Sequence, residues 1–124
     1  MTRRLRSSGG AVAIEYAIIL PALLVMVLGI IDVGRLLWNQ TTLDRAVEAA
    51  ARCAAINATL CGTAVQIQAY AVDQAFGLNV TAATFTVSKP ACGQTVEASM
   101  PFQLVIPWLA SSTLTLTATG CYPA

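Results

Sequence analysis

Few side chains in this sequence have types and spacings that could do chemistry, and the first is a glutamate inside an apolar run. Residues 11–31 are apolar except for Glu15 and the hydroxyl of Tyr16, with Pro21 near the middle. As a helix the run would be about 31 Å long, which is the thickness of a bilayer's hydrocarbon core. A carboxylate at that depth costs roughly 2.5–3.5 kcal/mol on insertion scales. We therefore expect Glu15 to have a charged partner.

The second group is four cysteines, Cys53, Cys61, Cys92 and Cys121, which all follow the apolar run. An even number in a small exported domain predicts two disulfides, in one of three pairings. We favour Cys53–Cys61, because it closes a short loop. The other bond would then be Cys92–Cys121, which ties the C-terminus back to a hairpin. Metal binding is the alternative, but the sequence has no histidine and no Cys-x-x-Cys pair, so we expect no metal site.

Other catalytic patterns are missing from the sequence. There is no phosphate-binding glycine loop and no carboxylate pair outside the expected helices, and the serines and cysteines have no plausible base nearby in sequence. We therefore expect neither enzymatic activity nor a cofactor. The formal net charge of +1 provides no bulk attraction to nucleic acid, so we expect no nucleic-acid partner.

The local positive charge lies before the apolar run. Arg3, Arg4 and Arg6 precede it, and no acidic residue occurs before Glu15. The positive-inside rule then predicts a cytoplasmic N-terminus, with the chain after residue 31 carried across the membrane. We expect a single-pass inner-membrane protein whose head is periplasmic or extracellular.

Residues 1–10 form a short basic leader that ends in Gly9 and Gly10. An ordinary secretory signal has its small-residue cleavage site after the apolar stretch, whereas here the small residues come before it. Cleavage between Gly10 and Ala11 would therefore keep the span in the mature protein. Ala11 would become the first residue and Glu15 the fifth.

This spacing suggests a role for Glu15. A free amino group at Ala11 would carry positive charge into an apolar environment, and the Glu15 carboxylate could offset it in the same helix or in a neighbouring subunit. Because an unpaired buried charge is expensive, such pairing favours one stagger between adjacent helices. The alternative is a Glu15 side chain that reaches the headgroup region.

The local sequence Gly10-Ala11-Val12-Ala13-Ile14-Glu15-Tyr16 resembles the processing motif of the Flp/Tad branch of type IV prepilins. The longer run from residue 9 to about 55 is similar to the TadE-like family. The residues that carry this second resemblance are Glu15, Pro21, Gly29, Asp32, Gly34, Arg35 and the Ala49-Ala50-Ala51-Arg52 end of the helix.

The resemblance implies a minor pilin or pseudopilin of a Tad (type IVc) pilus. Its partners would be a prepilin peptidase, the membrane, other pilins and the proteins of the assembly platform, with Glu15, Tyr16 and Pro21 in the assembly helix. The main rival is an uncleaved single-span membrane protein with a periplasmic binding head. A third reading, a small secreted enzyme, would require a soluble mature form without residues 11–31.

The helix is expected to continue as an amphipathic segment over residues 32–57. Asp32 and Arg35 can pair at i, i+3, and Trp38 would anchor at the far surface of the membrane. Pro21 is expected to kink the span or open it locally. An apolar stripe at helical spacing would face the head and consists of Leu36, Leu43, Val47, Ala50 and Ala54.

The exported part, residues 58–124, is predicted to be an α+β head. Thr63 would cap a second helix at 64–76, and Gly77 would suit its C-terminal end. Its expected core contacts are Val65, Tyr70, Val72 and Phe76.

Beyond that helix the periodicity changes to two, which predicts three half-buried antiparallel strands. Pro101 predicts a bulge or one irregular edge in the second of them. The sheet would cover the polar half of the long helix in a pilin-like layout. The strands are expected at 80–88, 95–106 and 113–119, with a hairpin loop at 89–93 and a second connection at 107–109.

Overall fold

The computed structural model describes residues 9–106 and 113–124 of the 124-residue chain. Most of the expected leader, residues 1–8, and the expected connection at 107–109 lie outside the described residues.

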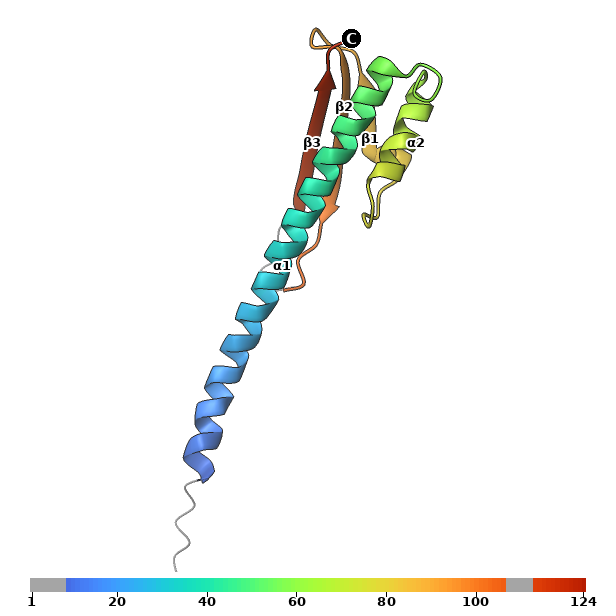
Figure 1. Cartoon of the computed structure of the whole chain (residues 1–124). Helices are drawn as coiled ribbons and strands as arrows, with labels where there is room; N and C mark the ends of the chain where they lie inside the picture. Colours follow the sequence, from blue (N-terminus) through green and yellow to red (C-terminus); the bar gives the residue numbers. More distant parts are fainter. Residues whose placement is uncertain (1–8, 107–112) are drawn as a thin grey trace, which may run out of the picture.

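The described chain has the predicted α+β layout, a long helix beside a small head (Figure 1). The head packs along the C-terminal half of the long helix, and the N-terminal half extends beyond it. The elements are α1 (Gly9–Ile56), α2 (Ala64–Gln74), the 3-10 helix η1 (Ala82–Thr84), β1 (Phe85–Ser88), β2 (Gln94–Phe102) and β3 (Leu114–Tyr122).

Helix α1 is continuous through Pro21, so the helix does not open there, and the alternative of a kink stays a prediction. It ends where predicted. The Asn57 side chain accepts a hydrogen bond from the Leu60 amide at 3.0 Å, which stabilises the turn that follows the helix.

The predicted apolar stripe of α1 is confirmed. Leu43, Val47 and Ala50 are fully buried, and Leu36 and Ala54 are partly buried against the same core. The sheet approaches this face very closely. A Cβ atom at Gly120 of β3 would lie 2.6 Å from the carbonyl carbon of Val47, so only glycine fits there without a shift of the backbone.

The sheet has the order β1-β2-β3 with antiparallel neighbours. Strands β2 and β3 pair without a break from Gln94↔Tyr122 to Phe102↔Leu114, so the alternative of a bulge at Pro101 is wrong. The pairing of β1 with β2 extends only to Phe85↔Ala98. Pro101 therefore has a neighbouring strand on one side only, which is the irregular edge that the sequence allowed.

Helix α2 begins at the predicted cap, where Thr63 and Gln66 form a capping box. Its expected core face is wrong in part. Val65 and Phe76 are 74% and 71% exposed, and the buried residues are Ile67 and Ala71. These two are four residues apart and so share one face of the helix, which packs on the core. Tyr70 and Val72 are partly buried beside that face.

The boundaries of α2 and of the strands also differ from the prediction. Helix α2 ends at Gln74, before residue 76, and Gly77 follows with a φ of +76°. The 3-10 turn η1 replaces the start of the first strand. There the Thr81 amide donates to the Thr84 hydroxyl oxygen, and the Thr84 amide donates to the Thr81 carbonyl oxygen. Strand β2 ends at Phe102, and β3 continues to Tyr122 because Gln94 pairs with it.

Candidate functional site

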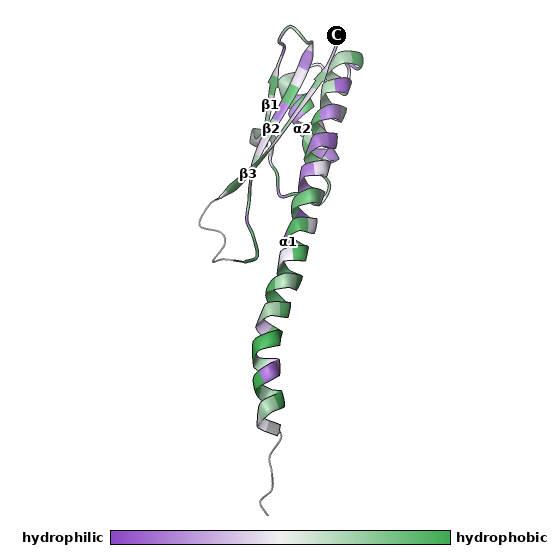
Figure 2. Cartoon of the chain, turned by 90° about the vertical axis from the view of Figure 1, so that its left-hand side faces the viewer, coloured by the Kyte–Doolittle hydropathy of each residue, from purple (hydrophilic) through white to green (hydrophobic). Residues whose placement is uncertain are grey.

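The N-terminal half of α1 has no cover from the rest of the described chain. From Gly10 to Ile31 every residue is exposed except Gly29, which is intermediate. The exposed side chains are large and apolar, as the nearly continuous hydrophobic colour of this half shows (Figure 2). Among the described residues there is one helix long and apolar enough to cross a membrane, and it is α1. This half of the helix therefore needs a lipid or protein environment.

The expected processing and assembly residues lie on this uncovered half. Ala11 and Glu15 are one helical turn apart and so lie on the same face. Within the described part of the chain Glu15 forms no salt bridge, the ion pair there being that of Asp32 with Arg35. Tyr16 is 68% exposed, and Pro21 is also exposed. Among the described side chains the Glu15 carboxylate therefore has no cation to pair with, and its charge partner stays a prediction.

Immediately after the apolar run, α1 carries a buried carboxylate. Asp32 is only 4% exposed. Its two oxygens accept hydrogen bonds from the Val105 amide at 2.9 and 3.0 Å, and one of them also lies 3.4 Å from the Ile106 amide. The predicted pair with Arg35 is present, with 3.3 Å between Asp32 Oδ1 and an Arg35 terminal nitrogen. These contacts satisfy a charge that would otherwise be costly to bury.

Arg35 connects this carboxylate to the sheet. Its guanidinium carbon lies 5.4 Å from the centre of the Phe102 ring, at the end of β2. We call Asp32, Arg35, Phe102, Val105 and Ile106 the Asp32 cluster. It attaches the segment after β2 to α1, one residue beyond the apolar run. The sequence predicted the ion pair but not the backbone contacts. A carboxylate has about four acceptor sites, and Arg35 alone cannot fill them, so further donors to Asp32 could have been expected.

Both disulfides have the pairing that the sequence favoured. Cys53–Cys61 joins the last turns of α1 to the loop before α2, with 5.7 Å between the Cα atoms. Cys92–Cys121 joins the β1–β2 hairpin loop to β3, with 6.5 Å between the Cα atoms. The two bonds therefore lie at the end of the head that is remote from the apolar half of α1 (Figure 1).

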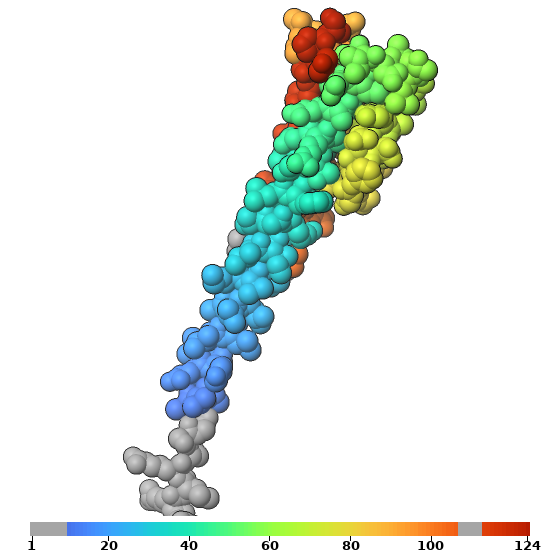
Figure 3. Space-filling model, in the orientation of Figure 1, coloured from blue at the N-terminus to red at the C-terminus, as the bar shows by residue number. Residues whose placement is uncertain are grey.

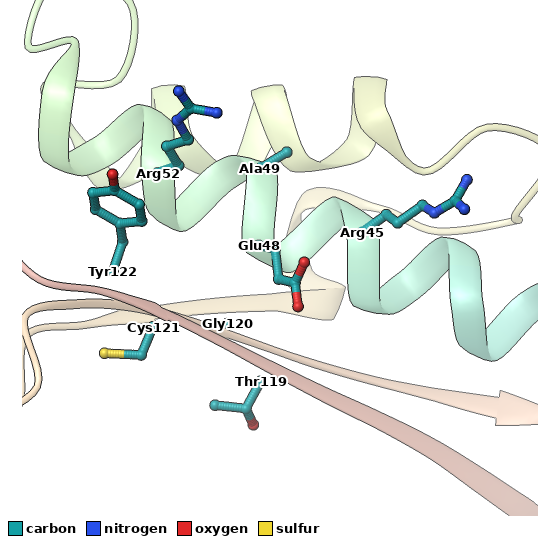
Figure 4. A pocket seen from close by; sticks show the side chains of 8 residues that line it. All are labelled: Arg45, Glu48, Ala49, Arg52, Thr119, Gly120, Cys121 and Tyr122. Atoms are coloured by element: carbon teal, nitrogen blue, oxygen red, sulfur yellow. The ribbon is translucent and has the colours of Figure 1, made fainter.

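A cavity of about 450 Å³ lies between the C-terminal half of α1 and β3. Its charged side chains do not converge on one point. Glu48 reaches toward the strand, whereas Arg45 and Arg52 point away from it in different directions (Figure 4). This arrangement provides no set of groups that could act together on one ligand.

Comparison with protein families identifies the N-terminal part of the chain. Residues 10–52 match a family model described as TadE-like protein. The match begins at Gly10 and runs through the apolar half of α1 and the Asp32–Arg35 pair to Arg52. The resemblance of this segment to the TadE-like family is thus confirmed. No curated protein and no solved structure matches the chain.

Proposed function

We propose that this protein is a minor pilin or pseudopilin of a Tad (type IVc) pilus. A TadE-like segment indicates a protein associated with that pilus system. In the finer proposal, a prepilin peptidase cuts between Gly10 and Ala11 and removes the basic leader. Residues 11–31 then act as the membrane and assembly helix, residues 32–57 carry the head, and residues 58–124 form the exported domain.

The observation that carries this proposal is the uncovered half of α1, which contains the expected cut between Gly10 and Ala11. The α1 residues from Gly10 to Ile31 are almost all exposed in the described part of the chain, while the second half of the same helix contributes Leu43, Val47 and Ala50 to the core of the head. One helix thus has an apolar half that can lie in the membrane and a second half on which the head packs. This arrangement suits a pilus subunit, which leaves the bilayer when its lipid contacts are replaced by contacts with the helices of other subunits.

Glu15 would guide that exchange. Alone in the span its carboxylate is costly, but next to the new amino terminus of Ala11, in its own helix or a neighbour's, the charge is offset. The head would lie on the far side of the membrane from the basic leader, as the charge asymmetry predicts.

Intact-mass spectrometry of membrane-extracted protein tests the processing step in cells with an active prepilin peptidase. We expect the mature chain to begin at Ala11, and Gly10→Leu to block cleavage because a bulky side chain crowds a site that accepts glycine. Gly34→Leu is the matched control, since nothing lies within 4 Å of a Cβ atom at that position. Retention of residues 1–10 in the parent protein would favour the rival, an uncleaved single-span protein with a binding head.

A further inference from the structure

A polar pocket lies where the head meets the end of the apolar run. It is formed by Arg35 and Asn39 on α1, Asn79 after α2, and Gln103 after β2, with a volume of about 510 Å³. The rest of its lining is Gly77, Leu78 and the end of β2, Met100, Pro101 and Phe102. We call this the Arg35 pocket. It combines one guanidinium with three carboxamides, which are hydrogen-bond donors suited to a phosphate.

The guanidinium in this pocket is held in place by its own chain. One terminal nitrogen contacts Asp32, and the guanidinium carbon lies over the Phe102 ring. Arginine has five N–H groups, so these contacts leave donors free at the edges of the group. The Asp32 carboxylate in turn is already bonded to backbone amides of residues 105 and 106, which partly offset its charge.

The depth of the pocket along α1 matches that of lipid headgroups. Arg35 follows the end of the apolar run, residue 31, by four residues, or about 6 Å of helix. The headgroup layer adds roughly 5–7 Å on each side of the hydrocarbon core. Side chains of a helix also lean toward its N-terminus, which here is the membrane side.

Two exposed aromatic residues, Trp38 and Phe76, lie next in sequence to residues near this pocket. Trp38 is 65% exposed, and its ring nitrogen lies 4.0 Å from a Cβ atom built on Gly77. Phe76, which precedes that glycine, is 71% exposed. Phe76 follows the end of α2, and this end of α2 lies beside α1 on the side of the head nearest the apolar half of the helix (Figures 1 and 3). Aromatic side chains beside a basic one are typical of the membrane–water boundary.

From this position and chemistry we infer that the Arg35 pocket binds the phosphate of a phospholipid headgroup in the leaflet below the head. The inference rests on the membrane insertion of residues 11–31 in the proposed function. Bound lipid would hold the head at a fixed height above the bilayer until the subunit is extracted. Extraction would then require this contact to break.

The test uses the full chain purified in a sugar-headgroup detergent, which contains no phosphate. Native mass spectrometry measures retention of phosphatidylglycerol against a glucosyl lipid with the same tails. We expect one phospholipid retained about tenfold more strongly than the sugar lipid, since a charge-assisted contact is worth about that factor. Equal retention of the two lipids would overturn the inference.

Three variants and a competitor locate the site. Arg35→Gln should remove the phosphate preference, and Asn79→Leu, which leaves the Asp32 cluster intact, should weaken it. Arg45→Gln is the matched control because it removes the same charge about 15 Å further along α1. An equal loss in the control would overturn the site. Displacement by glycerol 3-phosphate as effective as by lipid would overturn the lipid assignment.

Failure of this inference is distinguishable from failure of the proposed function. Alkaline carbonate extraction reports insertion of the span, and intact mass reports cleavage, each independent of lipid retention. A chain that is inserted and cleaved but has no phosphate preference would refute the Arg35 pocket alone.

Discussion

Replacing Asp32 tests the contact that attaches the sheet to α1 next to the apolar run. In Asp32→Asn the side chain keeps its shape but loses its charge, and one of its two oxygens becomes an NH₂ group. In the parent protein the Val105 amide donates to both carboxylate oxygens of Asp32. In the variant the asparagine NH₂ group would replace one of these acceptors and would face the Val105 N–H, donor against donor. The Arg35 contact would lose its ionic component. We expect the segment after β2 to detach from α1 more often.

The magnitude follows from these contacts. A hydrogen bond to a charged group contributes about 1.5–3 kcal/mol, so weakening one such bond should destabilise the head by about 2 kcal/mol. Asp32→Ala removes the carboxylate that accepts from the amides of residues 105 and 106. Breaking a buried charge pair usually lowers the free energy of unfolding by about 3–5 kcal/mol, and we expect a loss in that range. Asp73→Asn, an exposed position on α2, is the matched control and should change stability by less than about 0.5 kcal/mol.

The assay is hydrogen exchange at the Val105 amide together with urea unfolding of the detergent-solubilised chain. Because 1.4 kcal/mol is a factor of ten, the Val105 amide should exchange at least about tenfold faster in Asp32→Asn. Amides in the centre of β2 should change less, since their partners in β3 remain. If Asp32→Asn and Asp73→Asn give the same exchange rate and the same unfolding midpoint, the carboxylate does not hold this segment.

Three further predictions concern assembly, cross-links and packing. Glu15→Ala should still be inserted and at least partly cleaved but should no longer co-purify with other pilins. Glu15→Gln should assemble nearly as poorly, and Glu15→Asp should be intermediate. Normal assembly of Glu15→Ala would refute charge pairing. Removing Cys53–Cys61 and Cys92–Cys121, which span separations of 8 and 29 residues, should lower the free energy of unfolding by about 2.5 and 3.6 kcal/mol on loop entropy alone. Non-reducing peptide mapping checks the pairing, and a Cys53–Cys121 peptide would contradict it. Gly120→Ala should destabilise the head by about 1–3 kcal/mol, because its Cβ atom would meet the α1 backbone. Gly29→Ala is the control and should not destabilise the head, because there is open space around Gly29. Equal thermal unfolding midpoints for the two variants would contradict the close approach of β3 to α1.

Much of this fold depends on local pattern, and that part could be predicted from the sequence. The apolar run and the later stripe at helical spacing determine α1, because side chains three and four residues apart share a face whatever packs against it. Thr63 and Gln66 form their capping box within one turn, so the start of α2 was also predictable. Alternation at period two identified the three strands, and the spacing of the cysteines favoured the observed pairing.

For the candidate site as well, one part could be predicted from the sequence and another could not. Glu15 was noticeable because a charge inside an apolar run is costly in any fold. The described residues offer its carboxylate no salt bridge, so the charge partner that we expect for it stays a prediction.

The tertiary structure decided where distant segments meet. Phe76 was expected in the core by its apolar character, but α2 packs through Ile67 and Ala71, so Phe76 is exposed. Gly120 has no sequence pattern that reveals its contact with Val47, because the two are brought together only when β3 crosses α1. Asp32 could be matched in sequence with Arg35, yet its strongest contacts are backbone amides more than seventy residues away. Backbone amides are present at every non-proline residue, so only the folded path of the chain selects which of them a carboxylate binds.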